Sequence, residues 1–428
     1  MPNAFQKMTD SELSAQLADL DRQADSLRVL GLKLDMARGR PSPEQTALSR
    51  PMLDLLGSDS DLDDQGVAAD NYGAPDGLPS ARALAAELVG VEPSHVIVNG
   101  SSSLNLMHDV VCNAYTHGIG GNKPWCAQGP IKFLCPAPGY DRHFTVTARY
   151  GIQNVPVPMR TDGPDMDVVR RYVEEDASVK GIWCVPKYAN PTGVTYSDEV
   201  VRAFAHLKPA APDFRIFWDN AYVVHTFKGE GDELMNVFDA LAEAGSVDLV
   251  YEFASTAKVT FPGSGMAWVS ASAADLAELR QAFSSMRVCP EKISQLAHVR
   301  FLRDAAGVHA HMARHAELIA PRFALVQEKL SRGLGKLDCA TWTDPNGGYF
   351  VSFEGPEGSA KEVVSLAAEL GVKLTPAGAP WPYGEDPRDT NIRIAPTYPS
   401  LDELSQALDV FVVAVKLVSA RLAAAERA

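Results

Sequence analysis

The chain has 428 residues and a formal net charge of −15, from 39 lysines and arginines against 54 aspartates and glutamates. Hydrophobic residues make up 46% and charged residues 22%, as in globular proteins with a sizeable core. The acidic excess disfavours binding to nucleic acid or to anionic membranes. We find no signal-peptide pattern and no apolar run of the roughly 20 residues that a membrane helix needs. We therefore expect neither nucleic acid nor a membrane as a partner.

The six cysteines are scattered and form no C-x-x-C pair, which indicates reduced thiols and a cytoplasmic protein. The nearest approach to a metal motif is "HAHMARH", in which His311 and His315 would share one face of a helix. The glutamate of H-E-x-x-H is missing. We therefore expect no metal site, and two histidines on a partly exposed helix.

The first element predicted is an amphipathic helix that follows the capping-box pattern "TDSE", residues 9–12, and runs to about residue 30. Two loops come next, "LDMARGRPSPEQ" and "NYGAPDGLPSAR". Beyond them, apolar β-rich runs such as "HVIVNG", "IKFLCPAPGY" and "FRIFWDNAYVV" alternate with helical runs. These strands are apolar on both sides, which predicts a mostly parallel sheet with helices on both faces.

The last part of the chain is predicted to be helical from "PEKISQLAHVRF" to about residue 333, and then to form a smaller α+β segment. We therefore predict an α/β fold in three stretches. Residues 1–55 form the N-terminal segment of a small domain, and residues 56–307 form the large domain. Residues 308–428 form an interdomain helix and the rest of the small domain. The N-terminal segment is expected to pack with the C-terminal one.

Polar residues follow several predicted strands, at the edge where open parallel sheets bind their ligands. Gly100 to Ser103 follow "HVIVN" and open a helix, Asn190 follows "GIWCVP", Asp219 ends "FRIFW", and Lys258 follows "LVYEF". Each is ordinary alone, because Asn-Pro-Thr-Gly is a good turn and a lysine in a Ser/Gly-rich loop is usually solvated. Their order along the chain, with Tyr222 just after Asp219, makes the combination specific.

This order resembles that of the fold-type I pyridoxal-phosphate (PLP) enzymes, and specifically the class I/II aminotransferases. The phrases "LDMARGRPSPEQ", "NGSSSLNLMHD", "CPAPGYDRHF" and "STAKVTFPGSG" further resemble the group Ic bacterial aspartate aminotransferases and, distantly, the aminotransferase-like domain of MocR regulators. The resemblance implies that residues 56–307 bind PLP. It also implies ping-pong transamination of an amino acid with a 2-oxo acid through a Lys258 aldimine. Aspartate or glutamate, with 2-oxoglutarate or oxaloacetate, are the expected substrates.

The resemblance also implies a role for each residue at the reacting end of the cofactor. Lys258 would hold PLP as a Schiff base and, once released, move the Cα proton as general base. Asp219 would keep the pyridine nitrogen protonated, since a nearby carboxylate favours the cation. Asn190 and Tyr222 would donate hydrogen bonds to the ring oxygen beside the aldehyde, and Tyr140 would stack on the ring.

The phosphate and the substrate have their own expected contacts. Gly100, Ser101 and Ser102 at a helix N-terminus, together with Ser255, would bind the phosphate. Tyr72 of the partner subunit would reach it across a homodimer with shared active sites. Arg393 would clamp the substrate α-carboxylate near Asn190 and Gly39. Arg40 is a candidate for the distal carboxylate of the substrate, as are Arg38, Lys187 and Arg142.

One departure from the family pattern concerns the charge of the phosphate. Many relatives read S-x-S-K followed by P-G-x-R, whose arginine pairs with the phosphate, but this chain reads "STAKVTFPGSG" and has Gly265 at that position. We expect neutral donors to replace the arginine: the helix N-terminus, the partner's Tyr72 and the hydroxyls of Ser101, Ser102, Ser255 and Ser264. A cation from elsewhere in the chain is the rival explanation.

Two other functions stay open on the sequence. The same fold could carry other PLP chemistry on an amino acid, such as a lyase or decarboxylase reaction, because fold does not fix reaction type. A non-catalytic PLP- or effector-binding module of the MocR type is the second. It would need a basic winged-helix domain in front, whereas about 30 acidic-leaning residues precede "LDMARG".

Overall fold

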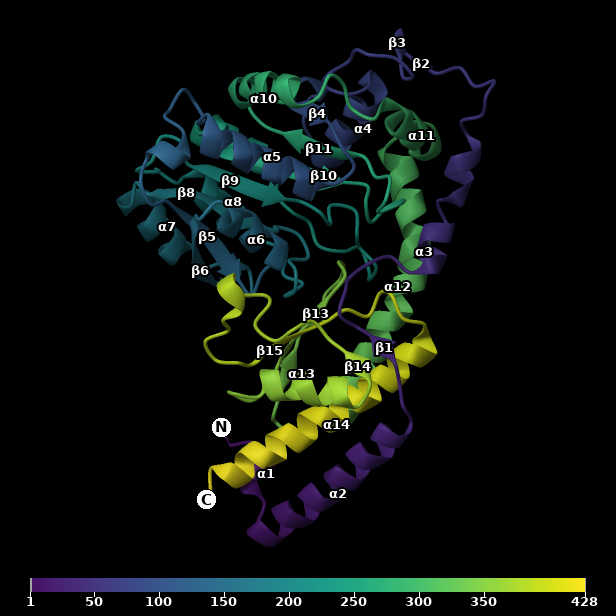
Figure 1. Cartoon of the computed structure of the whole chain (residues 1–428), viewed down its shortest axis with the longest axis vertical. Coiled ribbons are helices and arrows are strands. Elements are labelled where there is room, and N and C mark those ends of the chain that lie inside the picture. Colours follow the sequence, from purple (N-terminus) through teal and green to yellow (C-terminus); the bar gives the residue numbers. More distant parts are fainter. Residues whose placement is uncertain (1, 428) are drawn as a thin grey trace.

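The computed structural model describes residues 2–427, which form a large α/β unit and a smaller α+β unit (Figure 1). The long helix α12 (Ala305–Leu334) runs from one unit into the other. Both chain termini lie at the end of the molecule farthest from the large sheet. None of the helices in residues 2–427 is long and apolar enough to cross a membrane.

The large unit is built on an eight-stranded sheet with the order β4-β11-β10-β9-β8-β5-β6-β7. The strands are β4 (Val96–Val98), β5 (Lys132–Ala137), β6 (Gln153–Arg160), β7 (Gly163–Pro164), β8 (Val179–Cys184), β9 (Arg215–Asp219), β10 (Val250–Ser255) and β11 (Ala267–Ser270). The five strands from β10 to β6 are parallel neighbours, whereas β11 runs antiparallel to β10 and β4, and β7 to β6. The predicted mostly parallel sheet is confirmed.

Helices cover both faces of this sheet, because its strands are apolar on both sides. On β9, Phe217 packs into a core with α5 and α10, while Ile216 and Trp218 pack into a second core with α8 and α9. The helices of this unit are α4 (Pro79–Val89), α5 (Ser103–Thr116), α6 (Asp141–Arg149), α7 (Met166–Glu175), α8 (Asp198–Ala205), α9 (Val237–Ala244), α10 (Ala273–Met286) and α11 (Lys292–Leu302). A hairpin of β2 (Asp63–Asp64) and β3 (Val67–Ala68) lies in the loop before α4.

The small unit joins the two ends of the chain, as predicted. Its C-terminal part has the antiparallel strands β12 (Thr341–Trp342), β13 (Val351–Glu354) and β15 (Asn391–Ile394), with helices α13 (Ala360–Glu369) and α14 (Leu401–Ala425). From the N-terminal side, β1 (Leu34–Asp35) pairs in parallel with β14 (Val372–Lys373), and α1 (Ala4–Lys7) and α2 (Asp10–Val29) lie along α14 (Figure 1). The domain boundaries themselves stay predictions.

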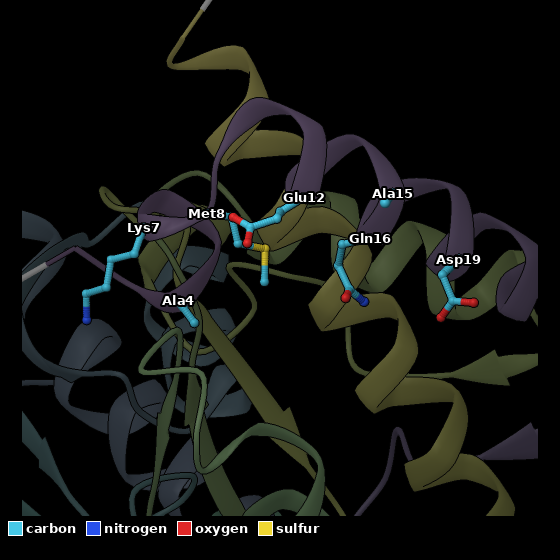
Figure 2. Close-up of a pocket in the computed structure, with 7 residues that line it drawn as sticks. All are labelled: Ala4, Lys7, Met8, Glu12, Ala15, Gln16 and Asp19. Carbon is cyan, nitrogen blue, oxygen red and sulfur yellow. The ribbon is translucent and has the colours of Figure 1, made fainter.

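The N-terminal helices form as the sequence indicates. Thr9 and Glu12 make the predicted capping box at the start of α2, and Leu13 and Leu20 enter the core that α14 shares. A groove of about 670 Å³ lies along α1 and α2, lined by Lys7, Glu12 and neighbouring residues (Figure 2). It lies far from the carboxyl ends of the parallel strands.

Shorter elements connect these parts. Helix α3 (Pro43–Ala47) lies against α12, and short 3-10 turns span Arg50–Asp54, Pro93–His95, Trp125–Ala127, Val247–Leu249 and Pro382–Gly384. On α12, the expectation of partly exposed histidines is wrong. His311 is 6% exposed and His315 is 1% exposed, because α3 covers that face of the helix. Among residues 2–427 there is no group of three or more His, Cys, Asp or Glu that could hold a metal ion.

Candidate active site

The candidate site lies at the carboxyl ends of β8, β9 and β10, which are neighbours in the sheet. Because these strands are parallel, the residues that follow them meet at one edge. Asp219 is the last residue of β9, Lys258 lies in the turn after β10, and Asn190 lies in the loop after β8. The loop after β4 reaches the same region, since the Ala267 amide donates to the Gly100 carbonyl at 3.0 Å.

Asp219 is a buried carboxylate in which one oxygen accepts a hydrogen bond and the other does not. It is 3% exposed, and its Oδ2 accepts a hydrogen bond from His143 Nε2 at 2.9 Å. Its Oδ1 is buried and has no partner among the described residues. A buried carboxylate oxygen without a donor is costly. Asp219 is therefore built to receive one further N–H or O–H donor from a bound group.

His143 is a site residue that sequence reasoning missed. It lies in the first turn of α6, and its ring stacks on Trp183 with centroids 4.6 Å apart and planes 13° apart. The signal was present in "PGYDRHF", because His143 follows Tyr140 by three residues at the start of a helix. Trp183 on β8 and Asp219 on the neighbouring β9 thus hold the imidazole in place.

Lys258 lies above the ring of Tyr222, with its Nζ 4.9 Å from the ring centroid. Burial lowers the pKa of the Lys258 ammonium, and the Asp219 carboxylate opposes that shift. Burial raises the pKa of Tyr222 well above its ordinary value, and the neighbouring Tyr140 hydroxyl and Asp219 carboxylate add to the effect. The lysine is thus biased toward the free amine that can act as a nucleophile, and Tyr222 toward the neutral hydroxyl.

Arg393 brings the small unit into the site from β15. Its Nη1 donates to Asn190 Oδ1 at 3.2 Å and to Asp141 Oδ1 at 3.0 Å, and its Nε donates to Thr375 Oγ1 at 3.3 Å. The amide oxygen of Asn190 faces this guanidinium, so its NH₂ group stays available for an anionic oxygen. Arginine and amide side chains from both units therefore meet beside the lysine.

The loop of residues 36–40 is held against this arginine by Phe350. The Arg393 guanidinium lies 4.9 Å from the Phe350 ring centroid. A Cβ added to Gly39 would stand 2.3 Å from the same ring, so glycine lets the main chain approach here. Gly39 and Arg393 thus share one aromatic neighbour, although they are far apart in the sequence.

Tyr140 is the residue that precedes α6, and it borders the site above His143. Its ring lies edge-on to the His143 ring, with centroids 4.9 Å apart. Burial first, and then the charges of Asp219 and Asp141, raise the pKa of Tyr140 to about 12. The hydroxyl therefore stays neutral, and the ring presents an aromatic surface next to Asp219.

The N-terminus of α5 forms a cradle of amide groups. Gly100 has φ +74°, and Ser102 precedes the helix without a hydrogen bond from its own side chain to the first turn. The amide N–H groups of residues 101–104 find no acceptor within the described chain. Free N–H groups and the positive end of the helix dipole make this position suited to a phosphate.

Comparison with known proteins decides the family. The family model for aspartate amino-transferase matches residues 8–427. The chain belongs to the aspartate aminotransferase family. An aspartate aminotransferase of Corynebacterium glutamicum is 40% identical over 403 residues, 94% of this chain and 93% of its own. A Mycolicibacterium smegmatis protein, whose name gives only the aminotransferase class, is 47% identical over 409 residues, 95% of this chain and 96% of its own.

Solved structures agree with this assignment. A crystal structure of an aspartate transaminase from Corynebacterium glutamicum has a TM-score of 0.95 at 38% identity, and the match covers 98% of this chain and 99% of that one. An α-aminoadipate aminotransferase from Thermus thermophilus, complexed with N-(5'-phosphopyridoxyl)-L-leucine, shows the same fold, with a TM-score of 0.72 at 22% identity. It covers 93% of this chain and 95% of its own. The family resemblance predicted from the sequence is confirmed.

This aminotransferase uses pyridoxal 5'-phosphate, and its side chains fit that cofactor. The free Oδ1 of Asp219 suits a protonated ring nitrogen, and the amides of residues 101–104 suit a phosphate. The buried amine of Lys258 is suited to a Schiff base. PLP-dependent transamination is thus the activity of the chain, and the lyase and MocR-type alternatives are not favoured.

The position of the missing phosphate arginine is filled by backbone. A Cβ added to Gly265 would stand 2.6 Å from the Ser101 carbonyl oxygen and 3.3 Å from Ala257, so any side chain there forces the loops apart. A cation does lie nearby. Arg287, at the end of α10, donates from Nη1 to Asn99 Oδ1 at 2.8 Å and pairs through Nη2 with Asp109. Its Nη1 is 4.0 Å from where Gly100 would carry a Cβ.

Arg287 was not found from the sequence, because it follows a helix far along the chain from the cradle. Two of the hydroxyls that we expected to bind the phosphate, those of Ser255 and Ser264, already have partners nearby. Ser255 Oγ accepts from the Ala257 amide at 3.4 Å, and Ser264 Oγ contacts Ser294 Oγ at 3.3 Å.

The four basic candidates for a distal carboxylate differ in position. Arg40 is exposed and stacks on Tyr398, with its Cζ 3.5 Å from the ring centroid. Arg38 and Arg142 are exposed. Lys187 donates to the Val223 carbonyl at 3.2 Å and lines a cavity beside residues 229–234, so it is not brought together with Asn190 and Arg393.

Proposed function

We propose that this aminotransferase transfers the amino group of aspartate or glutamate to 2-oxoglutarate or oxaloacetate. The main support for transamination is that Lys258, Arg393 and an Asp219 with one unpartnered oxygen meet at one edge of the sheet. The dicarboxylic substrate is supported by the aspartate aminotransferase of Corynebacterium glutamicum, at 40% identity over nearly the whole chain.

The residues of the chain divide the work of proton transfer. Lys258, whose pKa is lowered by burial, would take the proton from the substrate Cα as a free amine, hold it as an ammonium and then donate it. Asp219, oriented by His143, would hold the proton on the ring nitrogen of bound PLP. Asn190 and Tyr222 would donate to its ring oxygen. PLP, when bound, supplies the electron sink that makes the Cα proton acidic.

Arg393 orients the substrate through its α-carboxylate. Its Nη1 and Nε have partners in the chain, whereas no partner of Nη2 occurs among the described residues. Asp141 keeps the guanidinium in place beside Asn190. A carboxylate that bonds to Nη2 would therefore be aligned with Lys258 rather than free to rotate. Arg38, Arg40 and Arg142 remain our candidates for the distal carboxylate.

We further propose a homodimer in which Tyr72 reaches the phosphate of the partner subunit. Tyr72 is 77% exposed, although it is a large side chain in the loop before α4. Other exposed apolar residues support an interface between two copies of the chain, among them Leu53, which is 67% exposed, and Val288, which is 71% exposed.

We also propose that the protein is cytoplasmic. The six free cysteines support the reducing cytoplasm expected from the sequence.

Mixing inactive subunits tests the dimer. A hybrid of Lys258→Ala and Tyr72→Phe subunits should regain PLP affinity at one site per dimer, since one site then has both residues intact. A fully active monomer in sedimentation equilibrium contradicts the shared site.

A substrate panel tests the proposed specificity. The holoenzyme is incubated with each amino acid and with 2-oxoglutarate, oxaloacetate or pyruvate, and kcat/KM is measured for product formation. We expect aspartate and glutamate to give the highest values, and product to require an acceptor. If alanine or an aromatic amino acid exceeds aspartate, the dicarboxylic assignment is wrong. If ammonia or carbon dioxide forms without an acceptor, the reaction is a lyase or decarboxylase reaction.

A further inference from the structure

The two histidines of "HAHMARH" lie directly behind the turn that carries Lys258. His311 and His315 lie on successive turns of α12, and their Nε2 atoms are 3.1 Å apart. His311 Nε2 is 3.0 Å from the carbonyl oxygen of Val259, the residue after Lys258. Nothing in transamination as described above uses these histidines.

The hydrogen-bond partners fix where the protons of both rings lie. Gln45 accepts from the Ser42 amide through Oε1 at 3.0 Å, so its Nε2 is the group that donates to His315 Nδ1 at 3.1 Å. His315 therefore carries its proton on Nε2. A carbonyl can only accept, so the contact with Val259 places the His311 proton on Nε2 as well. The same carbonyl oxygen raises the pKa of His315, in opposition to burial.

Both rings are neutral because they are buried. Burial lowers the pKa of His315 to about 3, and the nearby His311 adds to that shift. Burial also lowers the pKa of His311. Two neutral imidazole rings thus lie together behind the turn, and His311 donates to its Val259 carbonyl, which is a fixed arrangement rather than a titrating one at neutral pH.

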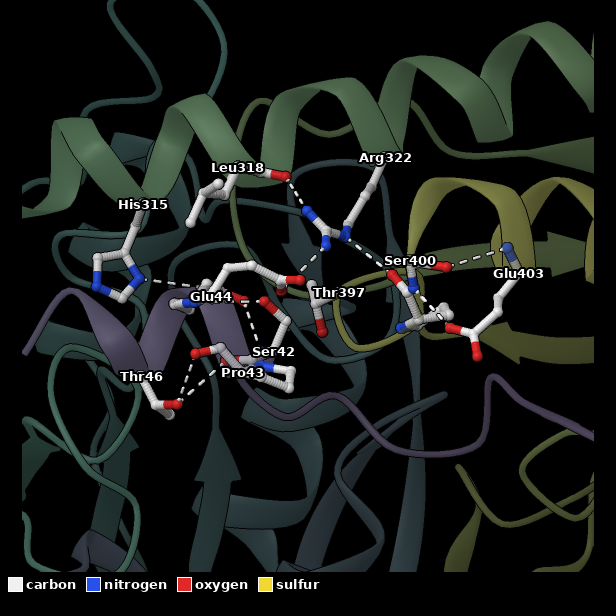
Figure 3. Close-up of polar contacts among 12 residues, drawn as sticks. Ser42, Pro43, Glu44, Thr46, His315, Leu318, Arg322, Thr397, Ser400 and Glu403 are labelled. Carbon is white, nitrogen blue, oxygen red and sulfur yellow. Dashed lines mark hydrogen bonds and ion pairs between the residues drawn. The ribbon is translucent and has the colours of Figure 1, made fainter.

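A second arm of the same network holds the carbonyl of Lys258 itself. Gln45 Nε2 also donates to the Tyr349 hydroxyl at 3.1 Å, and that hydroxyl donates to the Lys258 carbonyl at 3.5 Å. Figure 3 shows the side from which this arm comes: α3 lies along α12, and His315 points from α12 toward it. Arg322, about two turns further along α12, pairs with Glu44 of α3 at 3.5 Å.

We propose that His311 and His315 are positioning residues for Lys258. His311 holds the Val259 carbonyl and His315 holds His311 in place, while Tyr349, which accepts from Gln45, holds the Lys258 carbonyl. The proposal rests on Lys258 being the nucleophile of the proposed function. A lysine side chain has four rotatable bonds, so its amine can be placed only if the backbone below it is fixed. The network does this with side chains from α12, the N-terminal segment and the strand region of the small unit. It therefore makes the position of the lysine depend on how the N-terminal segment is docked.

The test compares variants that keep or remove the N–H donor at nearly constant volume. His315→Leu and His311→Leu remove it, whereas His315→Gln and His311→Gln keep an N–H near the position of Nε2. In the holoenzyme we expect the leucine variants to lose about 10- to 100-fold in kcat, because small displacements of a catalytic group cost that much. KM should change little, because Arg393 is untouched. The glutamine variants should recover most of the loss.

A second measurement does not depend on turnover. Lys258 of the apoenzyme is labelled with acetic anhydride at a series of pH values, and its modification is quantified by peptide mass spectrometry. The leucine variants should shift the midpoint of the Lys258 profile by about half a pH unit or more, since its surroundings change. If Lys258 is not the nucleophile, Lys258→Ala keeps its activity, a result that is distinct from failure of the network.

Met312→Ala is the matched control for lost stability. Met312 is buried on α12 next to His311, but its side chain has no N–H or O–H group that could donate to the carbonyls of the turn. It should lower the melting temperature without moving the labelling profile of Lys258. The proposal is overturned if the leucine variants match Met312→Ala in having a lower melting temperature but unchanged kcat and labelling profile.

Discussion

Removing the imidazole of His143 should weaken both the fold and the reaction through Asp219. His143→Leu keeps much of the volume but takes away the donor to Asp219 Oδ2. It leaves a 3% exposed carboxylate whose other oxygen has no partner among residues 2–427. A hydrogen bond to a charged group contributes about 1.5–3 kcal/mol, and an unsatisfied buried group costs a similar amount. The apoenzyme should therefore lose about 2–4 kcal/mol of unfolding free energy in urea.

In the holoenzyme the same change should lower kcat/KM by about 10- to 100-fold, since about 1.4 kcal/mol corresponds to tenfold. The carboxylate would turn toward other donors and hold the ring nitrogen less well. His108→Leu is the control, because that histidine is half exposed on α5 and contacts the Tyr150 hydroxyl. Urea titration and steady-state kinetics decide. If His143→Leu stays within twofold of the native protein in kcat/KM and matches His108→Leu in stability, the role assigned to His143 is refuted.

Three further outcomes are expected. Burial raises the pKa of Glu252 to about 8, so its folded state binds a proton between the unfolded value of 4.5 and pH 8, and its contribution to stability falls as pH rises through that window. Glu252→Gln should therefore stabilise the protein more at pH 8 than at pH 5, by up to about 1.4 kcal/mol per pH unit, and equal melting shifts at both pH values would contradict this. Arg287→Gln should weaken apoenzyme binding of PLP more than of pyridoxal, whereas Arg280→Gln on the same helix should not; if Arg287→Gln leaves the ratio of the two affinities unchanged, the neutral donors alone bind the phosphate. Gly265→Arg should lower the melting temperature, because its Cβ would meet the Ser101 carbonyl at 2.6 Å, and unchanged stability would show that the loops separate freely.

The large sheet and the order of the site residues could be predicted because both follow from short stretches of sequence. Strands that are apolar on both sides allow only a covered parallel sheet, and residues at their carboxyl ends must then meet. This reasoning placed Asn190, Asp219 and Lys258 at one edge, where the structure has them. It also led to Arg393 through the family pattern, although the contact between Arg393 and Asn190 joins residues far apart in the chain.

The features that could not be predicted depend on packing between distant segments. His143 acts only because α6 brings it beside Asp219, and Arg287 lies near Gly100 only because α10 ends there. The histidines of α12 looked half exposed, since nothing in "HAHMARH" says that α3 will cover them. Lys187 follows β8 just before Asn190 but turns to the Val223 carbonyl, because backbone direction in a loop does not follow from spacing.

The most direct test of the central claim is to find where the cofactor is attached. The holoenzyme is reduced with borohydride and digested, and the pyridoxyl-bearing peptide is sequenced by mass spectrometry. We predict a single modified lysine, Lys258, and loss of both the visible band and turnover in Lys258→Ala. A pyridoxyl group on another lysine, or the same adduct and turnover in Lys258→Ala, would contradict the account.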